Sequence, residues 1–382
     1  MIVVHFPSWF PNADSPLNGN FILRQIGTIA HSTSSIIFRH TNADLELQLP
    51  DNLRIHPVQS KSKGGIPYAY FTEFQHLVKN YGKPDFLHLH VALPLGPIAA
   101  FLSRKYNIPL IVSEHWSIYQ PVNRGQIKPL QRWLLQYIYR TAAHVTAVSQ
   151  NLLDNIGATV PAAAKKPQTV VGNVVDTELF SLKTAPLPSG KKQILHVSTL
   201  DNDAKNIMGI LHATRQLSLQ RSDFELNIVH DFRNEEAETF VRDNGLSDFV
   251  HFLGRKTSNE IAGLLHQSAF FLLFSNYENQ PCVLLEAFST GTPAVTTPVG
   301  GIPEITNEQN AVIVTPRDEV QLAEKMDIML TNYQNFTPAL IREKALKLCS
   351  PEIVGEKWME IYRMEMQETR AGMGTSTKAQ GH

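Results

Sequence analysis

Two glutamates, Glu278 and Glu286, lie in the stretch with the densest set of candidate functional residues, SNYENQPCVLLEAFSTGTPAVTTPVGGIPE over 275–304. Gln280 is placed to cap a helix that starts at the following proline and stops before Gly291. Glu286 then falls on its second turn, about 10 Å or more from Glu278 by helical rise. Carboxylates that hydrolyse one bond sit about 5–9.5 Å apart, so this pair is better suited to two parts of one long ligand. The alternative is a capped amphipathic helix with solvated carboxylates.

Other groupings of reactive residues are weaker. His88 and His90 alternate on one strand-like run and face the same side, but no third metal ligand is evident. Asp201 and Asp203 match the D-x-D pattern of some metal sites, although three-residue matches are common by chance. Cys282 has no identifiable base to activate it as a nucleophile. We therefore expect no metal site and no covalent role for this cysteine.

The elements that must position these residues alternate along the chain. Short apolar runs are followed by stretches of helical spacing, which predicts an α/β fold with helices on both faces of parallel sheets. Neither a GxGxxG after the first strand nor a GxxxxGK[ST] occurs, so the usual phosphate loops of dinucleotide and P-loop enzymes are missing. The strand-like runs are 2–6, 34–40, 86–91, 109–115, 144–149, 193–198, 225–230, 249–254, 270–274, 293–297 and 311–315, and helix-like stretches include 20–30, 258–268 and 319–326.

The runs fall into two sets separated by a Pro-, Ser- and Lys-rich stretch. We expect a first Rossmann-like domain over 1–180, a linker over 181–193 and a second Rossmann-like domain over 194–350. A helix over 351–368 is expected to return to the first domain, and the tail 369–382 to be disordered. Ligands of such sheets bind outside the carboxyl ends of the strands, so we expect the chemistry between the two domains.

Composition narrows the class of protein. With 382 residues, 43% hydrophobic and 18% charged, the chain is neither disordered nor fibrous. Its net charge of -1 argues against a nucleic-acid partner, although residues 1–180 carry 15 Lys+Arg against 10 Asp+Glu, and residues 181–382 carry 19 against 25. Two cysteines, no signal sequence and no apolar run longer than the twelve residues of 91–102 predict a cytoplasmic protein.

One stretch, QIKPLQRWLLQYIYR over 126–140, leaves two interpretations open. Lys128, Arg132 and Arg140 are interleaved with leucine, tryptophan and tyrosine, as in helices that lie on a membrane surface. A helix that covers a sheet has much the same composition. We expect core packing, with peripheral contact at the inner face of a membrane as the alternative.

The segment 275–304 resembles the signature of retaining glycosyltransferase family 4, a family of the two-domain GT-B class. The family pattern is E-G-F-P-x-V-x-x-E-A-x-A-x-G-x-P-V followed by G-G-x-P-E. Weaker similarities lie at 107–115, 142–152, 170–180 and 249–255, so the resemblance covers about residues 2–365. The residues of this chain that align with the pattern are Glu278, Asn279, Gln280, Pro281, Cys282, Val283, Glu286, Ala287, Gly291, Pro293, Gly300, Gly301, Pro303 and Glu304.

The resemblance implies a nucleotide-diphosphate-sugar donor and no cofactor. Glu286 would hold the ribose hydroxyls, and Glu278 would contact the hydroxyls of the donor sugar together with the N–H groups from Asn279 to Val283. Lys205 matches the lysine that contacts the diphosphate, whose negative charge grows as the sugar leaves.

One departure from the family lies close to this lysine. Thr199 occupies the place of an arginine that grips the diphosphate, which puts donor affinity in doubt. Arg255, just after the FLG strand end, is a candidate substitute, although a surface cation is the simpler interpretation. His230 stands where the family commonly has glycine.

Family positions in the first domain are Gly19, Asn20 and His115. Gly19 would lie against the donor phosphate and Asn20 on the acceptor side, where only one of two common glycines is present. His115 would orient the donor sugar or share a proton with the acceptor hydroxyl. His90 is a further candidate for the acceptor side.

The resemblance as a whole implies a retaining, metal-independent hexosyltransferase that uses a glycan or lipid-linked acceptor in cell-surface polysaccharide synthesis, and acts as a monomer or weak dimer. Two alternatives remain open: a sugar-nucleotide epimerase or phosphorylase of the same fold, and an inert sugar-nucleotide-binding or glycan-binding homologue.

Overall fold

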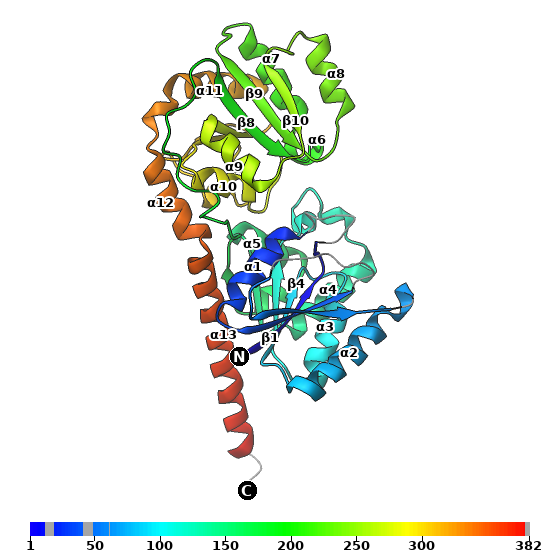
Figure 1. The fold of residues 1–382 in the computed structure, drawn as a ribbon. Coiled ribbons are helices and arrows are strands. Elements are labelled where there is room, and N and C mark those ends of the chain that lie inside the picture. The colour runs from blue at the N-terminus through cyan, green and yellow to red at the C-terminus, as the bar shows by residue number, and fades with distance from the viewer. Residues whose placement is uncertain (12–18, 41–48, 61, 379–382) are drawn as a thin grey trace. The chain divides into compact units, whose positions relative to one another are not determined.

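The computed structural model describes residues 1–11, 19–40, 49–60 and 62–378. The chain forms two compact units (Figure 1). Unit 1 contains Met1–Val174 together with the residues from Pro351 onward, and unit 2 contains Val175–Ser350.

The boundary between the units differs from the expected one. Phe180 is completely buried in a core cluster of unit 2, and the backbone N–H of Lys183 donates to the carbonyl of Thr290 at 3.0 Å. Residues 175–193 therefore belong to unit 2, and the predicted linker at 181–193 is wrong. Its composition indicated a loop correctly, but hydrogen bonds and an aromatic anchor hold that loop on unit 2.

Unit 1 is built on one seven-stranded parallel sheet of order β3-β2-β1-β4-β5-β6-β7. Helices α1 and α13 pack on one face, around Val3, Ile29 and Trp358, and the remaining helices pack on the other. The strands are β1 (Ile2–Pro7), β2 (Ser34–His40), β3 (Leu53–Val58), β4 (Phe86–His90), β5 (Leu110–Glu114), β6 (His144–Ala147) and β7 (Gln168–Val170), and the helices are α1 (Asn20–Ala30), α2 (Ile66–Tyr81), α3 (Gly96–Tyr106), α4 (Pro129–Thr141), α5 (Gln150–Thr159) and α13 (Pro351–Lys378).

Unit 2 is built on a six-stranded parallel sheet of order β10-β9-β8-β11-β12-β13. One core cluster lies under α7, α8 and α11, and the other under α9, α10 and α12. The strands are β8 (Lys192–Ser198), β9 (Phe224–His230), β10 (Val250–Gly254), β11 (Ser268–Leu273), β12 (Ala294–Thr296) and β13 (Ala311–Ile313), and the helices are α6 (Asn202–Lys205), α7 (Ile207–Ser218), α8 (Glu235–Asp243), α9 (Ser258–Gln267), α10 (Cys282–Ser289), α11 (Glu319–Asn332) and α12 (Pro338–Cys349).

These sheets confirm the predicted α/β class, with local differences. Strand β3 was missed because Arg54, His56 and Pro57 interrupt its apolar pattern, which an edge strand tolerates. The three-residue β7 was missed because it is short. The prediction that residues 369–382 are disordered is wrong for residues 369–378, which continue helix α13. A helix that has already formed adds further residues at little free-energy cost.

Helix α4 carries the segment for which two interpretations were open. Its inner face buries Leu135, Ile138 and Tyr139, but Leu130 is 68% exposed and Trp133 65% exposed. The expectation of core packing therefore holds for one side of the helix and is wrong for these two large apolar residues.

Candidate functional site

An ion pair lies at the carboxyl edge of the unit 2 sheet. Nζ of Lys205 is 2.5 Å from Oε1 of Glu278, and the hydroxyl of Ser275 donates to the same oxygen at 2.8 Å. Glu278 is only 9% exposed. The structure thus joins two residues that the sequence placed in separate roles. Ser275, which the sequence did not single out, fixes the carboxylate from the end of β11.

Helix α6 brings Lys205 to this edge. The carboxylate of Asp201 accepts a hydrogen bond from the N–H of Asp203 at 3.0 Å and so caps the helix. The N–H of Asn276, which follows β11, donates to the carbonyl of Ala204 at 2.8 Å. Because β8 and β11 are neighbours in the sheet, the loops after them meet. In the D-x-D match at 201–203, Asp201 is thus the N-cap of α6 and Asp203 lies in its first turn.

Gly300 makes room for the backbone of Glu278. Its φ of +57° lies in the left-handed region, and an added Cβ would be 1.7 Å from the carbonyl oxygen of Glu278. The next N–H, of Gly301, donates to the carbonyl of Asn279 at 2.9 Å. The glycine pair therefore fixes the loop that carries the carboxylate.

Replacing Gly300 with alanine is expected to destabilise unit 2 by about 1–3 kcal/mol, because the side chain is both strained and in collision. Urea unfolding followed by far-UV circular dichroism measures the change. Gly263→Ala in α9 is the matched control, since its added Cβ meets no heavy atom within 4 Å. Equal unfolding midpoints for the two variants would contradict the assigned role of Gly300.

Helix α10 begins one residue later than expected. Pro281 has extended backbone and is itself the N-cap, so Gln280 does not cap the helix and the first helical residue is Cys282. Gly291 has a φ of +77° after the C-terminus, as its position predicted. Glu286 lies on the second turn and is 6% exposed, so the solvated-carboxylate alternative is wrong for this residue. The other predicted donor-binding residues, Asn279, Gln280, Cys282 and Val283, are half-buried around the start of α10.

The residues considered for a diphosphate clamp lie at the same edge. Thr199 follows β8 and is exposed. Arg255 follows β10 and is 56% exposed, and its Nε donates to the carboxylate of Asp231 at 3.1 Å. Nδ1 of His230 lies 2.9 Å from the carbonyl of Phe232. The cation with an observed contact to Glu278 among the described residues is Lys205.

In unit 1, Gly19 and His115 lie on loops at the carboxyl edge of the sheet. Gly19 has a φ of +73° and precedes Asn20, the first residue of α1, and a Cβ there would be 2.6 Å from the carbonyl oxygen of Trp9. The ring of His115 lies 4.8 Å from that of Phe21, and both ring nitrogens are shielded from solvent. Burial lowers the pKa of His115 to about 3. Its imidazole is therefore neutral at ordinary pH.

Glu114, which the sequence did not single out, holds the His115 loop. Its buried carboxylate accepts from the N–H groups of Ala92 and His115, both at 2.9 Å, and from the hydroxyl of Tyr119 at 3.1 Å. Burial raises the pKa of Glu114 despite these hydrogen bonds. Glu114 is therefore a positioning residue for His115, and its place in the strand-end sequence SEH was the available signal.

His90 does not lie on an acceptor surface. It is completely buried on the sheet face that α13 covers, where Nδ1 of His5 is 3.1 Å from its Nε2 and its ring stacks on His88 at 4.1 Å. His5 thus supplies a third histidine to the pair His88 and His90, which the sequence did not reveal, and three such rings could in principle hold a metal ion. However, both ring nitrogens of His88 contact hydroxyls, those of Tyr362 and Ser113, at 2.7 Å. We interpret the cluster as a buried hydrogen-bond network.

Family-level comparisons match both halves of the chain. Residues 191–332 match the family described as Glycosyl transferases group 1, and residues 31–179 match the one described as Glycosyltransferase Family 4. The chain belongs to glycosyltransferase family 4. The two parallel sheets and their helices form the GT-B fold of this family.

Individual relatives are distant from this family 4 protein. The MMP alpha-(1->4)-mannosyltransferase of Mycolicibacterium hassiacum is 28% identical over 57% of this chain, and the match spans only 56% of that relative's length. Sucrose-phosphate synthase of Thermosynechococcus elongatus superposes with a TM-score of 0.76 at 16% identity, over 95% of this chain and 99% of the other. HepE of Anabaena in complex with UDP and glucose has a TM-score of 0.74 at 18% identity, over 94% and 98%. At 16% and 18% identity, the two solved structures indicate the fold of this chain and not its activity.

Proposed function

We propose that this protein is a glycosyltransferase that moves a sugar from a nucleotide-diphosphate donor to a glycan or lipid-linked acceptor in cell-surface polysaccharide synthesis. The observation that carries the proposal is the contact between Lys205 and Glu278 at the carboxyl edge of the unit 2 sheet. Ligands of parallel sheets bind at this edge. An ammonium and a carboxylate side by side suit the phosphate and the sugar hydroxyls of one donor, and HepE was solved with UDP and glucose.

The residues of unit 2 have distinct tasks in this proposal. Glu286 accepts hydrogen bonds from the ribose hydroxyls, and Glu278 accepts them from the sugar. As the bond to the sugar breaks, negative charge collects on the leaving diphosphate. Lys205 and the first N–H groups of α10 stabilise that charge more in the transition state than in the ground state. The configuration at the anomeric carbon is retained, and no metal takes part.

His115 is proposed to orient the donor sugar. Since its pKa is lowered to about 3, the neutral ring is a weak base at neutral pH. It can donate one hydrogen bond and accept another. We therefore assign it positioning of a hydroxyl, and not removal of the acceptor proton.

Association with the inner face of a membrane is part of the proposal. No helix in the described residues combines the length and apolarity needed to span a bilayer. Contact would be made by the exposed Leu130 and Trp133 of α4, beside the cations Lys128 and Arg132.

Thermal unfolding in the presence of nucleotides tests the proposed function. We expect one of UDP, GDP, ADP or dTDP to stabilise the protein by about 2.7 kcal/mol at a concentration 100 times its Kd. Glu286→Ala should remove most of this stabilisation. Glu308→Ala, which changes an exposed carboxylate of unit 2, is the matched control and should retain it.

Sugar turnover separates catalysis from binding alone. The exposed Thr199 in place of an arginine favours a non-catalytic homologue as the second candidate. Slow hydrolysis of a labelled nucleotide sugar that Glu278→Ala abolishes would exclude that candidate. If all four nucleotide diphosphates leave the unfolding temperature unchanged, the transferase proposal fails.

A further inference from the structure

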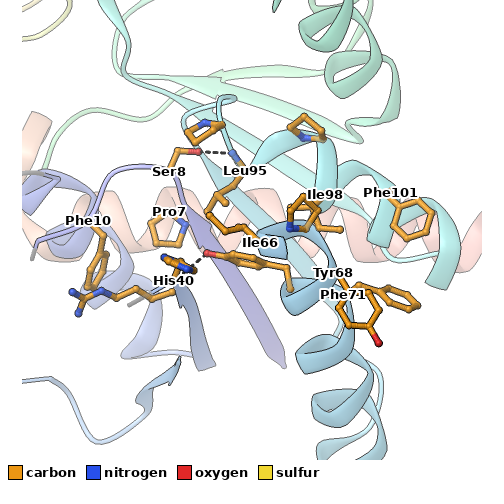
Figure 2. Close-up of a pocket in the computed structure, with 15 residues that line it drawn as sticks. Pro7, Ser8, Phe10, His40, Ile66, Tyr68, Phe71, Leu95, Ile98 and Phe101 are labelled. Atoms are coloured by element: carbon orange, nitrogen blue, oxygen red, sulfur yellow. Dashed lines mark hydrogen bonds between the residues drawn. The ribbon is translucent and has the colours of Figure 1, made fainter. Parts of the chain in front are cut away.

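A large cavity lies within unit 1, apart from the residues discussed so far. Its volume is about 910 Å³, within the range of small-molecule sites. It is lined by the end of β1 and the residues after it, the end of β2, the first turns of α2 and α3 and the segment that leads into α3. Figure 2 shows Tyr68, Phe71 and Phe101 at one end with Phe10 at the other. The lining residues are Pro7, Ser8, Phe10, Arg39, His40, Ile66, Pro67, Tyr68, Tyr70, Phe71, Pro94, Leu95, Pro97, Ile98 and Phe101.

The walls of this cavity suit a hydrocarbon and not a sugar. Among the described residues that line the cavity, only Ser8, Arg39 and His40 are neither apolar nor aromatic. The hydroxyl of Ser8 already donates to the carbonyl of Val91 at 2.7 Å and accepts from the N–H of Leu95 at 3.2 Å. A sugar placed here would bury several hydroxyls with few hydrogen-bond partners, at about 1–3 kcal/mol each. A hydrocarbon chain has no polar groups and therefore needs no hydrogen-bond partners in the cavity.

The phenol oxygen of Tyr70 also has a hydrogen-bond partner within the protein. This oxygen accepts from the N–H of His40 at 3.0 Å. Nε2 of His40 is buried and has no hydrogen-bond partner among the described residues.

The charge around the cavity favours an anionic head group. None of the described residues that line the cavity is acidic. Nζ of Lys105 lies 4.5 Å from the ring centre of Phe71 and 6.0 Å from that of Phe101, at the aromatic end. An anion that emerges past the aromatic rings would therefore lie close to the ammonium of Lys105.

We propose that the cavity binds the hydrocarbon chain of an anionic amphiphile, whose head group lies beside Lys105. The inference rests on the proposed function and narrows its acceptor to a molecule with a lipid-like chain and a negatively charged head group. The exposed rings of Tyr68 and Phe101, 71% and 46% accessible, form the mouth through which the chain enters.

Calorimetric titration of the full chain with single-chain amphiphiles below their micelle concentrations tests the proposal. Dodecyl phosphate should bind with one-to-one stoichiometry and about tenfold or more tighter than dodecyltrimethylammonium, which has the same chain and the opposite charge. Inorganic phosphate should show no binding at the same concentrations. Equal affinities for the two amphiphiles, or phosphate binding as tightly as dodecyl phosphate, would overturn the proposal.

Variants locate the binding. Tyr68→Glu combined with Phe101→Glu should weaken dodecyl phosphate binding about tenfold or more, since carboxylates then stand at the mouth. Tyr81→Glu combined with Val122→Glu changes two exposed apolar residues of unit 1 outside the lining and should have little effect. Unchanged circular dichroism establishes that both variants fold. Equal losses in the two pairs would refute the assignment to this cavity.

The head-group position has its own test. Lys105→Gln should weaken dodecyl phosphate and leave dodecyltrimethylammonium unaffected or tighter, whereas Lys79→Gln, an exposed lysine on α2, should change neither. These titrations contain no nucleotide. Dodecyl phosphate binding without any nucleotide response would refute the proposed function alone, and the reverse result would refute this inference alone.

Discussion

Lys205→Ala is expected to lower kcat for sugar turnover by about 10²- to 10³-fold, with a smaller change in KM. The ammonium contacts Glu278 at 2.5 Å and is assigned to the diphosphate whose charge grows as the sugar leaves. Its loss removes an interaction that strengthens in the transition state. Steady-state hydrolysis or transfer with the nucleotide sugar identified by thermal unfolding measures the effect.

The control for this prediction is another lysine of unit 2. Lys347→Ala removes a side chain that is 69% exposed and should leave kcat unchanged. Lys205→Arg should recover part of the activity, since it restores the charge with a different shape. Because Lys205 and Glu278 are in contact, the double variant with Glu278→Gln should lose less than the product of the single losses. A kcat for Lys205→Ala close to that of the native protein would refute the assigned role.

The stability of unit 1 is expected to fall steeply in mild acid. Burial lowers the pKa of His5 to about 3, and burial together with neighbouring histidines lowers the pKa values of His88 and His90 well below the usual range. Above about pH 6.5 these rings are neutral in both the folded and the unfolded state. Below it the unfolded chain binds protons that the folded chain excludes, so stability is lost as pH falls toward 3.

His5→Gln tests this dependence. The variant should show a free energy of unfolding that falls less steeply between about pH 6 and 4, by about 1.4 kcal/mol per pH unit. Tryptophan fluorescence during urea unfolding isolates unit 1, because all four tryptophans lie there. His31→Gln, at an exposed histidine, should keep the native slope. Parallel pH profiles for His5→Gln and the native protein would contradict the buried, neutral state of His5.

Features set by neighbours in the sequence were predictable from it. The alternation of apolar runs and helical stretches predicted nearly all strands, because a parallel strand buried on both faces needs a continuous apolar run. The 275–304 segment indicated the Glu278 loop, a helix with Glu286 on its second turn, and Gly291 after it, because caps and left-handed glycines act within a few residues. The misplaced N-cap at Gln280 shows the limit, since one backbone angle at Pro281 decides where the helix starts.

Only the tertiary structure decided which distant segments meet. The order of strands puts β8 beside β11, which brings Lys205 to Glu278 across 73 residues, and puts β1 beside β4, which brings His5 to His90 across 85. The same order moved His90 from a proposed acceptor surface into a buried network and enclosed the cavity of unit 1. The sequence by itself determined the family, most of the strands and the loop that carries Glu278. Strand order, burial and the contacts of charged groups depend on long-range packing, which no local pattern encodes.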